Sequence, residues 1–98
     1  MKRKLVIETN SADTLFEDYR YEISKALIKG VEWGIRYKKD IVCFAKIILN
    51  RIIVVELSIH RVDFEHIIDE NIKTLVEAEE YEVCALGMKL KQKLNKQL

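Results

Sequence analysis

The chain has 98 residues, of which 49% are hydrophobic and 34% are charged, and its formal net charge is +1. This length suits one domain with a modest core, and the apolar content excludes a disordered chain. A net charge so close to zero gives no general attraction to nucleic acid or to an acidic membrane surface. We therefore expect one folded domain over residues 1–98.

The N-terminal sequence predicts a cytoplasmic protein, and this in turn predicts the state of the cysteines. Basic residues 2–4 are followed by the apolar run 5–7, which is far shorter than the apolar core of a signal peptide. Cys43 and Cys84 are expected to be free thiols, because the cytosol keeps such pairs reduced. The thirteen Ile and twelve Lys, against five Arg, indicate an AT-rich coding source such as a low-GC bacterium, its phage or a mobile element.

The first elements are predicted to be a short strand and a helix. Residues 5–7 form the strand, and a helix follows from about residue 14 to residue 29 with apolar residues at three- and four-residue steps. Thr14 and Glu17 have the spacing of a capping box. Gly30 is expected to end the helix.

Residues 31–37 alternate between apolar and polar side chains, which predicts a half-buried strand. A competing interpretation continues the first helix through Tyr37 and makes residues 40–49 a helix as well. The β-branched content and the glycines favour strands.

Residues 41–59 are the most apolar part of the chain, since fourteen of the nineteen are apolar and nine are Val or Ile. We expect two strands connected at Asn50 and Arg51, with Ile47 opposite Val54. Both faces of this hairpin are then apolar. One face is predicted to combine Val31, Trp33, Ile35, Tyr37, Ile41, Cys43, Ala45, Ile47, Leu49, Ile52 and Val54. The other is predicted to combine Val42, Phe44, Ile48, Ile53, Val55, Leu57 and Ile59.

Two helices are predicted after residue 59. The first begins at Asp63, a natural N-cap, and carries a clean amphipathic stripe from Phe64 to Val76. The acidic residues at 79–82 would lie on the apolar seam of a continued helix, so we expect a break near 78–81. The second helix ends in several lysines, whose charge opposes the acidic first helix if the two pack antiparallel.

Residues 75–94 resemble the helical-hairpin UVR motif of excision-repair proteins. The likeness lies in the acidic-aromatic-acidic turn at 79–82 and in the small pair Cys84-Ala85 that follows it. The Arg-Asp pair of that family is absent and Gly87-Met88-Lys89 stands in its place, so its charged contacts do not carry over. The resemblance implies a helix-turn-helix geometry and protein–protein interaction.

No motif predicts an enzyme, a metal site or a cofactor. His60, Asp63 and His66 lie close together in the sequence, but they flank a strand-to-helix corner and lack a third strong ligand for zinc. Glu56 is the best candidate for an acid or base, and it is more simply a residue at the margin of the sheet or the partner of a Lys or Arg. The three glycines are isolated, so no phosphate-binding loop is present.

The sequence therefore predicts an α+β domain of order β-α-β-β-β-α-α, with a mainly antiparallel sheet and a C-terminal helical hairpin. We expect a non-catalytic adaptor or regulatory protein, such as a phage or mobile-element accessory factor, that forms a homodimer and binds another protein. Its interface is predicted to include Phe44, Ile53, Val55, Leu57, Ile59, Tyr81 and Met88. The alternative is a regulator that binds nucleic acid through its terminal lysines and through Trp33 and Tyr37.

Overall fold

The computed structural model describes residues 3–97 and contains one three-stranded sheet with four α-helices. Its elements in chain order are β1 (Leu5–Thr9), α1 (Leu15–Asp18), α2 (Arg20–Arg36), β2 (Ile41–Leu49), β3 (Ile53–His60), η1 (Arg61–Asp63), α3 (Phe64–Glu77) and α4 (Tyr81–Gln97). The strands lie in the order β1-β2-β3, with β1 parallel to β2 and β2 antiparallel to β3. The α+β class and the C-terminal helical hairpin are confirmed, and the sheet is mixed.

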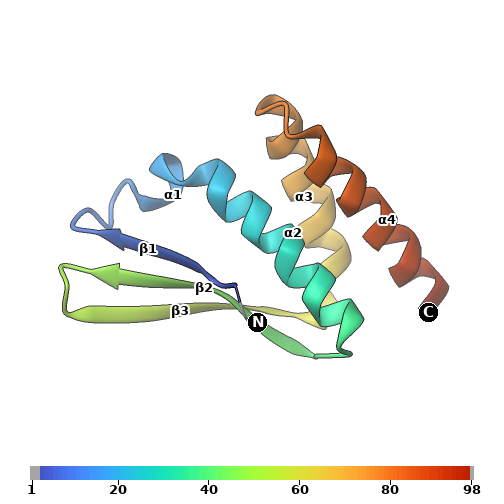
Figure 1. Cartoon of the computed structure of the whole chain (residues 1–98), viewed down its shortest axis with the longest axis horizontal. Helices are drawn as coiled ribbons and strands as arrows, with labels where there is room; N and C mark the ends of the chain where they lie inside the picture. The colour runs from blue at the N-terminus through green and yellow to red at the C-terminus, as the bar shows by residue number, and fades with distance from the viewer. Residues whose placement is uncertain (1–2, 98) are drawn as a thin grey trace.

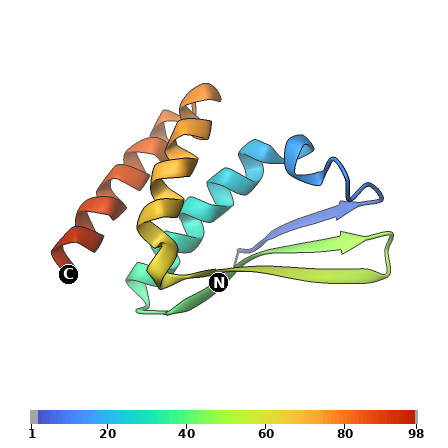
Figure 2. The same ribbon diagram turned by 180° about the vertical axis from the view of Figure 1, so that it is seen from behind.

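All the helices lie on one side of the sheet, and the other side is bare (Figures 1 and 2). Helix α2 packs directly on the strands, and α3 and α4 pack against α2 and each other. The turn between β2 and β3 lies at the opposite end of the molecule from α3 and α4 (Figure 1). The core consequently fills the space between the sheet and α2 and continues between the helices.

The hairpin turn forms at Asn50 and Arg51, as the sequence predicts, but its register is one residue different. Both residues have positive φ, at 53° and 63°, and Ile52 N–H donates to the Leu49 carbonyl at 3.1 Å. Positive φ at both central positions is the requirement of a type I′ turn. Ile52 is an extra residue after this turn, because Ile53 is the residue that lies opposite Leu49.

This shift and a bulge in β2 overturn the predicted faces of the hairpin. Ile47 lies opposite Val55 instead of Val54, so every side chain of β3 exchanges faces relative to β2. The register also slips between Cys43 and Ala45, which inserts Phe44 as an extra residue in β2. Phe44 and Ala45 are both buried as a result.

Residues 31–37 are the last two turns of α2, so the predicted strand is wrong and the competing helix is correct up to Arg36. The sequence predicts that Gly30 ends the helix, but Gly30 lies in the interior of α2. A Cβ at Gly30 would lie 3.0 Å from Phe44 Cβ, and one at Gly34 would lie 2.5 Å from Phe64 Cζ. The glycines therefore let α2 approach β2 and the start of α3 closely.

Helices α2 and α3 end in the same way, with a residue of positive φ just after the C-cap. Lys38 has φ 53°, and Lys39 N–H donates to the Gly34 carbonyl at 2.9 Å. Glu79 has φ 58°, and Glu80 N–H donates to the Leu75 carbonyl at 3.0 Å. Both are Schellman motifs. The second produces the helix break that the sequence predicts at 78–81.

The two predicted N-caps do not form. Thr14 Oγ1 donates to Asp18 Oδ2 at 2.7 Å instead of capping a backbone amide, and the first helix is divided at Tyr19 into α1 and α2. Asp63 precedes α3 without a side-chain capping bond, because η1 already brings the chain into a helical turn there.

Charged pairs connect the helices at the surface. Lys25 Nζ lies 3.3 Å from Glu80 Oε1, and Arg20 pairs with Glu77, so α2 is tied to both sides of the α3–α4 turn. Lys91 Nζ donates to Asp69 Oδ1 at 2.8 Å across the α3–α4 hairpin. The hydrogen bond and charge of Asp69 raise the pKa of Lys91 above its ordinary value. This pair confirms the predicted attraction between the acidic and the basic helix.

Candidate functional site

The candidate site is the open face, which we define as the face of the sheet turned away from the helices. The strand register assigns its residues, since partners in adjacent strands point to the same side. They are Val6, Glu8, Ile41, Cys43, Lys46, Ile48, Val54, Glu56, Ser58 and His60. Val6, Ile41 and Val54 are each more than half exposed. A solvated sheet face normally carries polar side chains, so three half-exposed apolar residues are unusual there.

A second exposed feature is the arm, which we define as residues 52–55 at the start of β3. Ile53 and Val55 point to the helix side of the sheet and Val54 points to the open face, yet all three are exposed. The arm therefore lies beyond the reach of the helices on one face and is bare on the other (Figure 1). Ile52 at its tip is 83% exposed.

The structure divides the interface residues that the sequence predicts. Phe44 and Ile59 are only 4% and 6% exposed and belong to the core, and Leu57 is half-buried against it. Ile53 and Val55 lie exposed on the arm. Tyr81 and Met88 are exposed as well, but they lie on α4, which packs against α2 and α3, away from the arm.

Sequence reasoning assigned Ile41 and Val54 to a core face and did not single out Val6. The signal that could have placed them on the open face is the polar character of their neighbours, since Lys46, Glu56 and Ser58 lie on the same face. That pattern becomes readable only once the bulge at Phe44 and the extra residue Ile52 are known.

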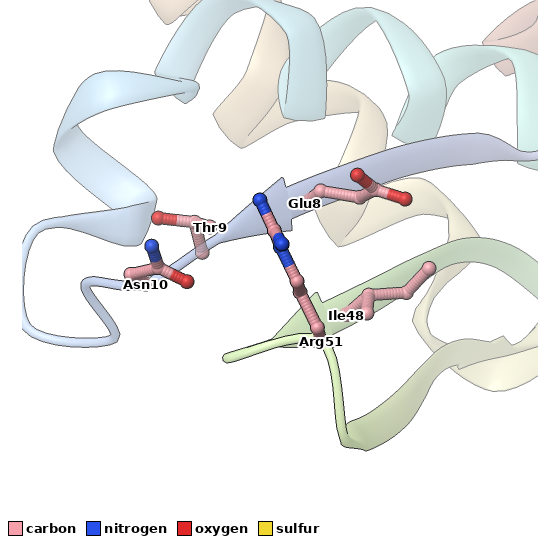
Figure 3. Close-up of a pocket in the computed structure, with 5 residues that line it drawn as sticks. All are labelled: Glu8, Thr9, Asn10, Ile48 and Arg51. Atoms are coloured by element: carbon pink, nitrogen blue, oxygen red, sulfur yellow. The ribbon is translucent and has the colours of Figure 1, made fainter.

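A hollow of about 380 Å³ lies where β1 ends beside the hairpin turn (Figure 3). It is lined by Glu8, Thr9, Asn10, Ile48 and Arg51. Asn50 N–H donates to the Thr9 carbonyl at 3.1 Å and so holds the turn against the end of β1. The Arg51 side chain extends from the turn across β1, between Thr9 and Glu8 (Figure 3). The hollow is open and polar, with one carboxylate and one guanidinium on its rim.

The residues considered for catalysis or metal binding do not converge. Within residues 3–97, no group of three or more His, Cys, Asp or Glu side chains could hold a metal ion. Glu56 lies directly across from Lys46 in the adjacent strand. Cys43 Sγ donates to the Ala45 carbonyl at 3.6 Å, and Cys84 is buried between α3 and α4.

The two aromatic residues considered for nucleic-acid binding do lie together. Trp33 and Tyr37 are one turn apart on α2, with ring centroids 4.3 Å apart at an interplanar angle of 44°. Tyr37 is exposed, and so are Arg36, Lys38 and Lys39 beside it. This group forms a small basic and aromatic patch at the end of α2.

No family model, no curated protein and no solved structure matches the chain. No helix within residues 3–97 is both long enough and apolar enough to span a membrane. The geometry defines a small α+β protein whose sheet is covered on one face only.

Proposed function

We propose that this chain is a non-catalytic protein-binding module whose open face receives another protein. The observation that supports this is the exposure of Val6, Ile41 and Val54 on a face that no helix covers. Exposed apolar side chains interspersed with polar ones on one face are compatible with an interaction surface. Lys46, Glu56 and His60 supply such polar groups on the same face.

The test is affinity capture from a lysate of the encoding organism, with bound proteins identified by mass spectrometry. Val6→Lys and Ile41→Lys each place a charge on the open face. Val6 lies on β1, away from β3, and Ile41 pairs with His60 at the end of β3 opposite the arm. Val76→Lys is the matched control, because Val76 is about half exposed on α3. We expect wild type and the control to retain a protein that both open-face variants lose. Retention of the same proteins by all four chains would contradict the proposal.

The second candidate function is nucleic-acid binding, which the adjacent, tilted rings of Trp33 and Tyr37 beside Arg36 favour. Binding of this kind is driven by phosphate contacts and weakens steeply as salt rises. Titrations of unrelated DNA and RNA at several salt concentrations, with wild type and Tyr37→Ala, test it. A salt-dependent affinity that the variant loses would support this function over the first.

A further inference from the structure

The outer edge of β3 is long, apolar and unprotected. Because β3 is the last strand of the sheet, one side of its backbone has no partner strand among the described residues. Proteins normally protect such edges with short strands, lysines or prolines. β3 has eight residues, no lysine or proline, and Glu56 as its one acidic residue. The opposite edge, β1, has five residues with Lys4 just before it and Glu8 within it.

The apolar residues of β3 are exposed on both faces of the sheet. Ile53 and Val55 are exposed on the helix side, and Val54 is exposed on the open face. A partner on one face would leave the other face bare. A strand that adds to the edge covers both faces at once and also satisfies the free backbone groups.

We infer that this added strand is β3 of a second copy, paired antiparallel around a twofold axis so that two sheets join into one of six strands. Isologous pairing of this kind closes at a dimer and leaves no further apolar edge to propagate. The proposed protein-binding function concerns the open face and the pairing concerns the edge of β3. Val54 belongs to both, so the binding test substitutes Val6 and Ile41 instead.

Symmetry restricts the register of the pair. A twofold axis perpendicular to the sheet requires one residue of β3 to lie opposite its own copy. Centring on Glu56 would place two carboxylates against each other, which is destabilising. Centring on Val55 places Ile53 opposite Leu57 of the second copy, and Val54 opposite Glu56. This register covers the three exposed apolar residues of the strand.

The ends of β3 are complementary in this arrangement. The turn before the strand carries Arg51, and the segment after it carries exposed Asp63 and Glu65. Antiparallel pairing brings the basic end of each copy towards the acidic end of the other. In this register Ile52 lies opposite Ser58 of the second copy, and η1, with Val62 91% exposed, continues beyond that position. Contacts between the turns and η1 would add to a strand edge that is small against the roughly 800 Å² per partner of a stable interface.

Light scattering after size-exclusion chromatography tests the pairing on the purified chain. We expect wild type at twice the 11.6 kDa chain mass, and Val55→Glu at 11.6 kDa. Val76→Glu, an equal charge change on α3, is expected to stay dimeric. Circular dichroism checks that each variant is folded. A wild type that remains at 11.6 kDa at high concentration would overturn the inference, as would a dimer that Val55→Glu leaves intact.

Substitutions of the opposite charge at Val54 test the register and provide a second route if Val55→Glu does not fold. Val54→Glu would face Glu56 of the second copy and is expected to raise the dissociation constant by about tenfold or more, whereas Val54→Lys would face the same carboxylate and retain the dimer. Equal dissociation of both variants would overturn the register.

These outcomes are independent of the proposed function. A monomer that still captures a protein through Val6 and Ile41 would overturn the self-pairing alone. A dimer that captures nothing would overturn the proposed binding function alone.

Discussion

The C-terminal half of α2 and the arm of β3 both carry apolar side chains, but those of α2 are buried in the core and those of the arm are exposed. Around α2, the ring of Phe64 packs so closely on Gly34 that a Cβ at position 34 would lie 2.5 Å from Phe64 Cζ. On the arm, Ile53 and Val54 are more than half exposed and fill no space within the chain. Residues of the first kind maintain the fold, and residues of the second kind are free to serve binding.

The largest difference between the two regions is expected on truncation of a side chain. Phe64 is fully buried, so Phe64→Ala should lower the free energy of unfolding by about 4 kcal/mol. Val54→Ala should change it by roughly 0.5 kcal/mol or less. Urea unfolding at two protein concentrations measures both and separates folding from association. A similar loss for the two variants would remove the distinction between the regions.

Adding one methyl group should be costly at Gly34 and cheap at Gly87. An alanine Cβ at Gly34 would lie 2.5 Å from Phe64 Cζ, and we expect a loss of about 1–3 kcal/mol. At Gly87 the atom nearest to an alanine Cβ would be Ile72 Cδ1, at 3.2 Å. The higher helix propensity of alanine would offset about 1 kcal/mol of the cost of this contact. In a Phe64→Leu background the cost at Gly34 should fall, because the clashing ring atom is gone. Thermal unfolding of the set would show whether the contact is as tight as described.

Glu79→Gly should stabilise the chain by about 0.5–1 kcal/mol, because the C′ position of α3 has φ 58° and glycine adopts that conformation without strain. The same substitution at Glu82, within α4, should cost about 1 kcal/mol of helix propensity. Chemical denaturation distinguishes the two by sign. A loss at both positions would show that the positive φ at Glu79 is not strained.

The smallest expected effect concerns Lys91. Its pKa is raised by Asp69, so the folded state holds this proton more tightly than the unfolded state does. The pair therefore contributes fully below the ordinary lysine pKa of about 10.4, and the contribution is lost as pH rises through the raised pKa. The difference in Tm between wild type and Lys91→Met should disappear in that alkaline range. If the difference in Tm were unchanged at high pH, it would come from packing of the Lys91 side-chain stem and not from the charged pair.

The parts of the fold that follow from local pattern could be predicted from the sequence. The stripe of α3 is confirmed in Phe64, Ile68 and Leu75, all fully buried, and the break before Tyr81 is where the acidic residues indicated it. The strand over 41–49 and a turn at Asn50 and Arg51 are also confirmed, and the positive φ of Arg51 is a finding of the structure.

The parts that depend on tertiary packing could not be predicted. Val31 and Ile35 alternate with polar residues as a strand would, but they also lie one helical turn apart on the buried side of α2. Gly30 and Gly34 favoured a helix end by propensity, whereas their role is to admit Phe44 and Phe64. Propensity is a weak guide where close packing decides the outcome.

The candidate site depended on the same kind of information. One bulged residue, Phe44, and one extra residue, Ile52, decide which side chains of β2 and β3 face the helices. Nothing in the local sequence marks either position, because both lie in an uninterrupted apolar run. The sequence therefore predicts contacts through the apolar hairpin, but it assigns the two faces of β3 the wrong way round.

The parallel pairing of β1 with β2 has a consequence for the order of folding. Leu5 pairs with Ala45 across the whole of α1 and α2, whereas β2 and β3 are joined by a tight turn. Closing the long loop costs more chain entropy than closing the short one. The hairpin and the helices can therefore assemble first, and β1 completes the sheet last, when α2 is already in place to receive it.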